Sequence, residues 1–385
     1  MSFLFYLGHP AHFHLFKYTI IELKEKGHDV IILIKKKDIL EDLLQSAGLT
    51  YFNINPKGRA DNKFSIAWNL LKRDVQFFRF ALRYKPDLMI GTSAEITHVG
   101  KLLGIPSIVV NEDDAEAVPL FAKLAYPLST HILAPDCCRV GKWDSKKISY
   151  NSYHELAYLY PGRFIPDQSV IEKMNPLQPY FILRFAKLNA HHDTGVTGIT
   201  TQLAEQVIAK LGNHGRVYIT SERELEPQFE KYRINIPPLD IHQALYFAQM
   251  YIGDSQTMAS EAAVLGTPSL RFNDFVGRLS YLEDLEHNYG LTTGIKTNEP
   301  EKLLNKIDEF LNTPDLKKEW SIRRTKMLSE KIDLTAFMVS LFENYPSAAP
   351  KKRSEFFRHS QRNDTLNQDG SSLTFSLSFY TSIHQ

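Results

Sequence analysis

The 385-residue sequence has little cysteine and no excess of charge of either sign. Its two cysteines, Cys137 and Cys138, are adjacent, so they can build neither a disulfide framework nor a metal site, and a reducing compartment is expected. Lys and Arg number 45 while Asp and Glu number 44, a net charge of +1 that argues against a polyanionic partner such as nucleic acid.

Long hydrophobic runs are also missing. No stretch reaches the roughly 18 consecutive apolar residues of a transmembrane helix. The opening stretch MSFLFYLGHPAHFH lacks the basic region and apolar run of a secretory signal. We therefore expect a cytoplasmic protein, which has access to activated donors such as nucleotides.

Short apolar segments alternate with amphipathic helical patterns along most of the chain. Residues 3–7 and residues 30–34, which follow Asp29 in the segment DVIILI (29–34), are apolar and enclose a helical pattern at about 15–26. Because these segments are apolar throughout, they are typical of a parallel sheet covered on both faces. The same alternation begins again at residues 180–185, so the sequence predicts an α/β protein with two sheets.

The segment at about 142–179 lacks this alternation and is rich in proline and tyrosine, which indicates a connection between domains. We predict an N-terminal domain at 1–165, a connector at 166–179 and a C-terminal domain at 180–346. Residues 347–385 are polar, Ser-rich and aperiodic, and disorder is expected there. Because ligands bind beyond the carboxyl ends of strands in open α/β sheets, the loops after strands are the candidate site.

The stretch GDSQTMASEAAVLGTPS follows an apolar segment and carries several polar groups. Ser255 is placed to cap a helix that begins at Gln256, and the free amides of that first turn form an anion site suited to a phosphate. Asp254, Ser255, Gln256 and Thr257 add polar contacts, and Glu261 could accept both hydroxyls of a ribose. The alternative is an ordinary capped helix with Glu261 exposed.

This stretch resembles the donor-binding helix of glycosyltransferases with the GT-B fold, and the corresponding stretch of the non-hydrolysing UDP-GlcNAc 2-epimerases. The resemblance implies that Glu261 holds a ribose and that the helix start meets a diphosphate. Ser255 stands where those families often have glycine. The upstream segment PPLDIHQALYFAQMYIGDS is similar to the GT-B segment that holds the nucleobase through backbone groups.

Over residues 1 to about 340 the chain resembles a narrower family, which carries the domain of unknown function 354. The resemblance lies in HPAHFHLFKYTIIELKEKGHDV, KPDLMIGTS, LGIPSIVVNEDD and ILRFAKLNAHHDTG. It implies a GT-B-like fold of two facing Rossmann-type domains with a cleft between them. The first loop, YLGHPAH, departs from the Asp and Asn that family members often carry there.

Three histidines follow the first apolar segment. A histidine is suited to deprotonate an acceptor hydroxyl near neutral pH, so catalysis or substrate contact is expected of His12 or His14. A metal ion shared by His12 and His14 is disfavoured. In an extended loop these two side chains would point to opposite faces, and no Cys or Glu lies beside them. The alternative is that one histidine caps the helix and another packs in the seam between the domains.

The motif NEDD follows another apolar segment, and its three carboxylates could act as a base or bind sugar hydroxyls. The resemblance to the epimerases implies a catalytic role for Glu112. The epimerases carry a second carboxylate, which would be expected directly after Gly91, but this chain has Thr92 there. The difference argues against an epimerase. The alternative role of this motif is to cap the next helix through Asp113 or Asp114.

The segment ILRFAKLNAHHDTG opens the second domain. Arg184 and Lys187 follow its apolar part and are suited to bind a diphosphate leaving group, Arg184 through two parallel hydrogen bonds. The resemblance to the epimerases implies that His191 or His192 faces the sugar. Of the two, we expect His192 to bind the substrate. The alternative is a hydrophilic loop without a role in binding.

The sequence therefore predicts a glycosyltransferase that moves a sugar from a nucleotide-sugar donor, with a UDP-sugar favoured, and that needs no metal or other cofactor. The acceptor is expected to be a carbohydrate or a lipid-linked group in surface polysaccharide or glycolipid synthesis. Aromatic and basic residues at 64–84 would suit contact with an anionic membrane, although packing on the sheet is favoured. The alternatives are a UDP-sugar 2-epimerase or hydrolase and a non-catalytic nucleotide-sugar binding protein.

Overall fold

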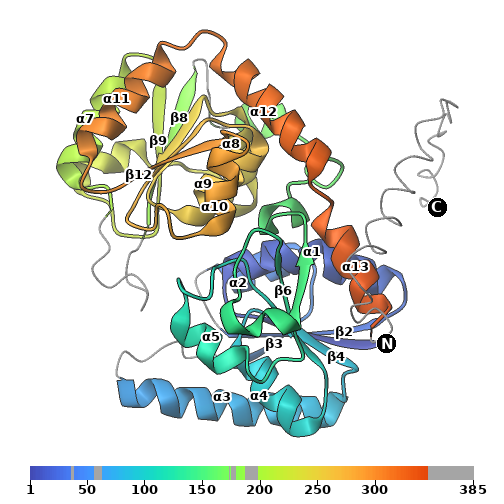
Figure 1. Cartoon of the computed structure of the whole chain (residues 1–385). Helices are drawn as coiled ribbons and strands as arrows, with labels where there is room; N and C mark the ends of the chain where they lie inside the picture. The colour runs from blue at the N-terminus through green and yellow to red at the C-terminus, as the bar shows by residue number, and fades with distance from the viewer. Residues whose placement is uncertain (36–38, 56–62, 173, 175–178, 187–197, 346–385) are drawn as a thin grey trace, which may run out of the picture. The chain divides into compact units, whose positions relative to one another are not determined.

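The structure is a computed structural model that describes residues 1–35, 39–55, 63–172, 174, 179–186 and 198–345. One compact unit, Met1–Glu343, contains two parallel sheets with helices on their faces (Figure 1). This arrangement confirms the predicted α/β class. The tail predicted at 347–385 lies outside the described residues.

In the described residues the first sheet has seven parallel strands in the order β3-β2-β1-β4-β5-β6-β7. The strands are β1 (Ser2–Leu7), β2 (Asp29–Lys35), β3 (Phe52–Asn55), β4 (Leu88–Gly91), β5 (Ser107–Val110), β6 (His131–Pro135) and β7 (Lys147–Tyr150). Strand β7 lies within the segment that was interpreted as a connection, and this part of the interpretation is wrong. The sequence KISY is a short edge strand that buries only Tyr150 fully, so it carries no continuous apolar signal.

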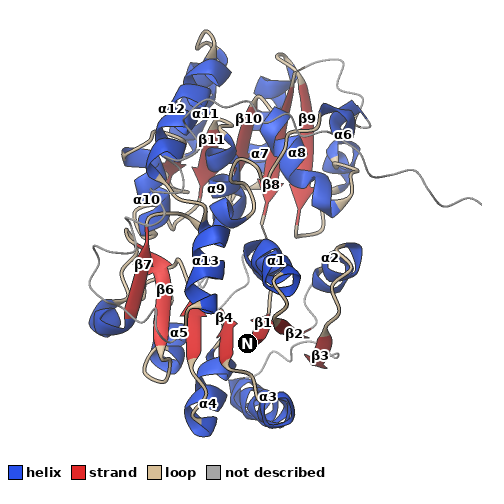
Figure 2. Ribbon diagram, turned by 90° about the vertical axis from the view of Figure 1, so that its right-hand side faces the viewer, coloured by secondary structure: helices blue, strands red, loops and turns tan. Residues whose placement is uncertain are grey.

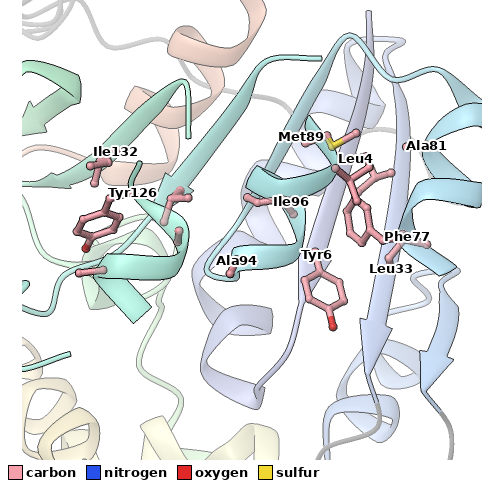
Figure 3. Packing of buried hydrophobic residues seen from close by; sticks show 14 of the residues in the cluster. Leu4, Tyr6, Leu33, Phe77, Ala81, Met89, Ala94, Ile96, Tyr126 and Ile132 are labelled. Carbon is pink, nitrogen blue, oxygen red and sulfur yellow. The ribbon is translucent and has the colours of Figure 1, made fainter. Parts of the chain in front are cut away.

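Helices cover both faces of this sheet. They are α1 (Pro10–Glu25), α2 (Leu40–Ser46), α3 (Lys63–Tyr84), α4 (Ala94–Leu103), α5 (Pro119–Ala125) and, from the end of the chain, α13 (Leu334–Glu343). Figure 3 shows Tyr6 and Met89 of the sheet beside Phe77 of α3 and Ile96 of α4. Burying an aromatic or aliphatic side chain in this way contributes about 1.5–3 kcal/mol. The burial of Phe77 confirms the packing interpretation for the described part of α3, and among the described residues no helix is both long and apolar enough to cross a membrane.

The opposite face of β1 is covered by helices from both ends of the chain. The ring of Phe5 lies 5.4 Å from that of Phe16 on α1 and 6.1 Å from that of Phe342 on α13. Successive residues of a strand point to opposite faces, so residues 3–7 of β1, which are all buried, have to be apolar. This packing explains the uninterrupted apolar run at the start of the sequence.

In the described residues the second sheet has five parallel strands in the order β12-β11-β10-β8-β9 (Figure 2). Its strands are β8 (Tyr180–Phe185), β9 (Arg216–Ser221), β10 (Met250–Gly253), β11 (Ser269–Phe272) and β12 (Thr292–Ile295). Its helices are α7 (Thr201–Gly212), α8 (Ile241–Phe247), α9 (Gln256–Leu265), α10 (Ser280–His287), α11 (Pro300–Leu311) and α12 (Leu316–Glu330). The shorter elements are α6 (Gln168–Glu172), η1 (Gly141–Lys146), η2 (His154–Ala157), η4 (Pro227–Tyr232) and η5 (Pro238–Asp240).

The start of α1 differs from the prediction. The sequence pattern placed the helix start near residue 15, whereas the helix begins at Pro10. Proline is favoured at the first helical position because its fixed φ suits the helix and its missing N–H would have no partner there. Nδ1 of His9 caps the helix by accepting the amide hydrogen of Ala11 at 3.2 Å. His12 and His14 therefore lie on a helix, and the expectation of an extended loop is wrong.

The predicted limits of α9 are confirmed. The hydroxyl of Ser255 caps the helix by accepting the amide hydrogen of Met258, and Gly266 ends it in the left-handed conformation with φ 77°. The strand before the helix requires a glycine, because a Cβ at Gly253 would lie 2.7 Å from the Cβ of Arg184 on the neighbouring strand. The close approach of β8 to β10 therefore leaves no room for a side chain at this position.

Candidate functional site

A cavity of about 230 Å³ lies where helix α1 and the segments after β4, β5 and β7 meet the first turn of α9. The carboxyl ends of the parallel strands thus supply one wall, as expected for ligand sites in α/β sheets. The other wall comes from α9 and from the segment between β11 and α10. The polar side chains on the two walls are His12, Thr92, Asn111, Glu112, Asp113, His154, Glu155, Tyr158, Gln256, Thr257 and Tyr281.

Glu112 lines this cavity, where the sequence motif NEDD placed a base. Its Oε2 accepts the amide hydrogen of His154 at 3.3 Å, and its Oε1 lies 3.4 Å from Nδ1 of the same histidine. Burial, followed by the nearby carboxyls of Glu155 and Asp113, raises the pKa of Glu112 well above 4.5. Burial also lowers the pKa of His154 to about 3, so this imidazole is neutral and its contact with Glu112 is not an ion pair.

Glu155 is the second glutamate of the cavity, and only 1% of it is exposed. Its Oε1 accepts a hydrogen bond from the hydroxyl of Ser260 on α9, whereas its Oε2 has no hydrogen-bond partner in the described part of the chain. Burial raises the pKa of Glu155 to about 7, with Glu261 and Asp113 adding to the increase. A carboxyl that titrates near neutral pH is suited to general acid–base catalysis.

Sequence analysis missed His154, Glu155 and Tyr158. All three follow β7, the strand that gave no apolar signal, and they lie in the segment interpreted as a connection. The signal that could have identified them is the dipeptide His-Glu directly after a short strand, in a chain where other strands end in polar loops. Without the strand assignment, this dipeptide had no position relative to the sheet.

His12 lines the cavity, but its environment makes it a poor base. Its Nδ1 accepts the amide hydrogen of Gly8 at 3.0 Å, and the hydroxyl of Thr92 lies 2.6 Å from its Nε2. Burial, followed by the charges of His9 and Lys35, lowers the pKa of His12 well below 6.5. His12 is therefore neutral at neutral pH and acts there as a hydrogen-bonding group.

His14 is not among the side chains that line the cavity. Its ring lies 4.9 Å from that of His242 and 5.2 Å from that of Tyr158, and burial lowers its pKa to about 3. The structure thus shows the arrangement given above as the alternative, since His9 caps α1 and His14 packs between residues of the two domains.

Glu261 is buried, with 6% exposed, and is already hydrogen-bonded. Its Oε1 accepts a hydrogen bond from the hydroxyl of Tyr158 at 2.8 Å and lies 3.0 Å from Nε2 of His242. Burial raises the pKa of Glu261, but the charge and hydrogen bonds of these partners outweigh it and leave the pKa below 4.5. The alternative of an exposed Glu261 in an ordinary capped helix is therefore wrong.

The residues at the start of α9 have different environments. Gln256 and Thr257 line the cavity, and the hydroxyl of Ser255 is engaged as the helix cap. Asp254 is 1% exposed and accepts amide hydrogens from Ala186 at 2.6 Å and from Ile199 at 3.2 Å. The carboxylate of Asp254 therefore anchors both ends of the segment that follows β8.

Arg184 lies at the end of β8 and does not line the cavity. Its Nη1 donates a hydrogen bond to the hydroxyl of Thr220 at 2.7 Å, and its Nη2 forms an ion pair with Glu222. Lys187 and His192 lie outside the described residues. In the part of the chain that the structure describes, no group of three or more His, Cys, Asp or Glu side chains is arranged to hold a metal ion.

Comparison with solved structures shows the same fold in two groups of proteins. The UDP-GlcNAc 2-epimerase from Neisseria meningitidis bound to UDP-GlcNAc is 13% identical, with a TM-score of 0.62 over 89% of this chain and 100% of that one. S. aureus MnaA in a co-structure with UDP is 12% identical, with a TM-score of 0.66 over 91% and 98%. The spinosyn rhamnosyltransferase SpnG complexed with spinosyn aglycone is 15% identical, with a TM-score of 0.59 over 89% and 100%.

These similarities confirm the GT-B-like fold of two parallel-sheet domains that the sequence resemblance implied. At identities of 12–15% they are similarities of fold alone. No curated protein matches the chain in sequence. The sequence matches the family described as protein of unknown function DUF354 over residues 4–345, and the chain therefore belongs to that family.

Proposed function

We propose that the protein is a glycosyltransferase that moves a sugar from a nucleotide-sugar donor, preferably a UDP-sugar, to a carbohydrate or lipid-linked acceptor. We place this reaction in the cytoplasm, in the synthesis of a surface polysaccharide or glycolipid. The observation that carries the proposal is Glu155, a buried carboxyl with a pKa of about 7 in a cavity bounded by the first turn of α9. Sugar transfer from a nucleotide sugar requires a proton acceptor for the acceptor hydroxyl and a site for the phosphates. This cavity combines a candidate base with an anion-binding helix start.

The donor is proposed to bind at α9. The first amides of a helix have no partner within the helix and attract phosphate, and Gln256 and Thr257 bring that turn to the cavity. Glu261, one turn further along the same helix, would accept the ribose hydroxyls in place of its present bond from Tyr158. Arg184 would reach the diphosphate by leaving its ion pair with Glu222.

Glu155 is proposed to act as the base. The hydroxyl proton of the acceptor moves to Oε2 of Glu155, which lacks a hydrogen-bond partner in the described residues. The acceptor oxygen then forms a bond with the anomeric carbon while the bond from that carbon to the phosphate oxygen breaks, and the nucleoside diphosphate leaves with the electron pair. Glu112 holds His154 in place, and neutral His12 holds the hydroxyl of Thr92 at the cavity wall. This assignment moves the role of base from His12, His14 and Glu112 to Glu155.

The test is nucleotide release from UDP-glucose and UDP-GlcNAc, measured with simple sugars and with lipid-linked sugars as acceptors. Glu155→Gln should reduce kcat at least 100-fold, because general base catalysis contributes about 10²–10⁴-fold. Glu301→Gln on the exposed surface of α11 is the matched control and should retain the wild-type rate. Equal rates in the two variants would overturn the assignment of Glu155, and nucleotide binding without release for every acceptor would favour a non-catalytic binding protein.

A UDP-sugar 2-epimerase or hydrolase is the second candidate. The observation in its favour is that Glu112 and Glu155 face one cavity, so a second carboxyl is present although Thr92 stands after Gly91. Epimerisation at C2 requires that a proton leaves this carbon and returns. Incubation of UDP-GlcNAc in D₂O without an acceptor tests this reaction, since deuterium at C2 would identify an epimerase and its absence together with acceptor-dependent release would identify a transferase.

A further inference from the structure

One wall of the cavity is acidic. Glu112, Asp113 and Glu155 line it, and no Lys or Arg is among the described side chains that do. The two histidines of the cavity do not supply positive charge, because burial lowers the pKa of His12 and of His154 well below neutral pH. The neighbouring charges that most strongly raise the pKa of Glu112 and of Glu155 are other carboxyls. A cationic group entering the cavity would stabilise the ionised form of these buried carboxyls, which their surroundings otherwise disfavour.

Two buried polar atoms on this wall have no hydrogen-bond partner in the described residues. They are Oε2 of Glu155 and Nε2 of His154. Nδ1 of His154 faces Oε1 of Glu112 at 3.4 Å, which favours the tautomer with the proton on Nδ1 and a lone pair on Nε2. Both orphan atoms are then hydrogen-bond acceptors. A buried acceptor without a donor destabilises the ligand-free protein, so this wall favours a ligand that supplies N–H or O–H donors.

The other side chains of the cavity restrict the type of cation. Leu15, Val118, Phe275 and Leu279 supply apolar surface, which suits a carbon skeleton rather than a hydrated ion. The acidic residues and histidines of the described chain are not arranged as a metal site. An ammonium group on a carbon skeleton has three N–H donors and a positive charge, and so meets both requirements.

We propose that the cavity recognises an acceptor that carries a protonated amine, such as an amino sugar, through Glu112, Glu155 and His154. The proposal rests on the proposed function, in which this cavity is the acceptor site. The amine donates to Nε2 of His154 and lies beside the carboxyls of Glu112 and Glu155, while Oε2 of Glu155 receives the hydroxyl of the same acceptor. The phosphates of the donor remain on the opposite wall, at the first turn of α9.

The experiment uses three free hexoses that differ in charge, namely glucosamine, glucose and glucuronate. Their binding to the full chain is measured by calorimetry at pH 7, with and without saturating UDP. Glucosamine should bind at least about tenfold more tightly than glucose, because a charge-assisted hydrogen bond is stronger than a neutral one, and glucuronate should bind more weakly than either. Glu112→Gln and Glu155→Gln should each reduce this preference, while Glu301→Gln should keep it.

Equal binding of glucose and glucosamine, tighter binding of glucuronate, or no binding of glucosamine up to its solubility would overturn the proposal. A preference that persists in both Glu→Gln variants would overturn it as well. The melting temperature of the same samples is also measured with and without nucleotides. This second measurement distinguishes failure of the amine proposal from failure of the proposed function. Stabilisation by a nucleotide without a preference for the amine defeats only the present proposal, whereas amine binding without nucleotide binding or turnover defeats the proposed function.

Discussion

The hydroxyl of Tyr158 donates a 2.8 Å hydrogen bond to Oε1 of Glu261, and this bond joins the segment after β7 to helix α9. Nε2 of His242 lies 3.0 Å from the same oxygen, and all three residues are buried. The carboxylate expected to hold a ribose is thus already occupied without a ligand. Binding of a nucleotide at this position has to replace the contact from Tyr158.

This competition predicts that Tyr158→Phe strengthens nucleotide binding. The variant removes a hydrogen bond to Glu261 that contributes about 1 kcal/mol in the ligand-free protein. The dissociation constant of UDP should therefore fall about fivefold, while the free energy of unfolding should fall by about 1 kcal/mol. Calorimetry and urea unfolding measure the two effects. Tyr232→Phe on η4 is the control, and weaker UDP binding in Tyr158→Phe would show that the hydroxyl contacts the nucleotide instead.

Glu155 predicts a pH-dependent loss of stability. Burial raises its pKa from 4.5 to about 7, so between these values the folded protein binds more protons than the unfolded chain. Stability should therefore fall as the pH rises from 4.5 through 7, and Glu155→Gln should remove this loss. We expect Glu155→Gln to match the wild type at pH 5 and to exceed it at pH 8 by on the order of 2 kcal/mol.

Urea unfolding of the wild type and Glu155→Gln at both pH values tests this prediction. Glu301→Gln replaces an exposed glutamate and should show the pH dependence of the wild type. A stability difference between Glu155→Gln and the wild type that is the same at pH 5 and pH 8 would contradict the raised pKa of Glu155.

Asp114 predicts a structural rather than a catalytic defect. It is fully buried, and its Oδ1 accepts the amide hydrogen of Arg139 at 2.7 Å while its Oδ2 accepts that of Ser280 at 2.7 Å. The carboxylate thereby caps α10 of the second domain from the first domain. Asp114→Ala leaves these buried amides without an acceptor and should lower the free energy of unfolding by about 2–4 kcal/mol.

The control for Asp114→Ala is Asp144→Ala, which alters an exposed residue of η1. Both variants should retain the affinity of the wild type for a nucleotide at a temperature where they are folded. Loss of stability in the two variants to the same extent would contradict the proposed role of Asp114.

The sequence predicted those parts of the fold that depend on local patterns. The apolar run of β1 and the start and stop signals of α9 were sufficient, because the burial of both sheet faces and the capping by Ser255 and Gly266 are determined by neighbours in the chain. Strand β7 was missed because it lies at the edge of its sheet. The start of α1 was placed too late, because Pro10 was not given its role at the first helical position.

The site was only partly predictable. Glu112 and Thr257 follow recognisable strands and line the cavity. Their position agrees with the rule that ligands bind beyond the carboxyl ends of parallel strands. Glu155 and Tyr158 depend on β7 and on contacts to residues more than 100 positions away, Ser260 and Glu261. The burial that raises the pKa of Glu155 comes from that tertiary packing and leaves no pattern in the sequence.

The most direct test of the account is a thermal shift with UDP, GDP, CMP, ADP and dTDP on the wild type and on Glu261→Gln. A ligand that binds only the folded state at about 100 times its dissociation constant adds about 2.7 kcal/mol of stability. We expect one nucleotide, UDP in the favoured case, to raise the melting temperature of the wild type by several degrees. The variant Glu261→Gln should lose most of this shift. Stabilisation by none of the five nucleotides, or an equal shift in both proteins, would contradict the donor site on α9.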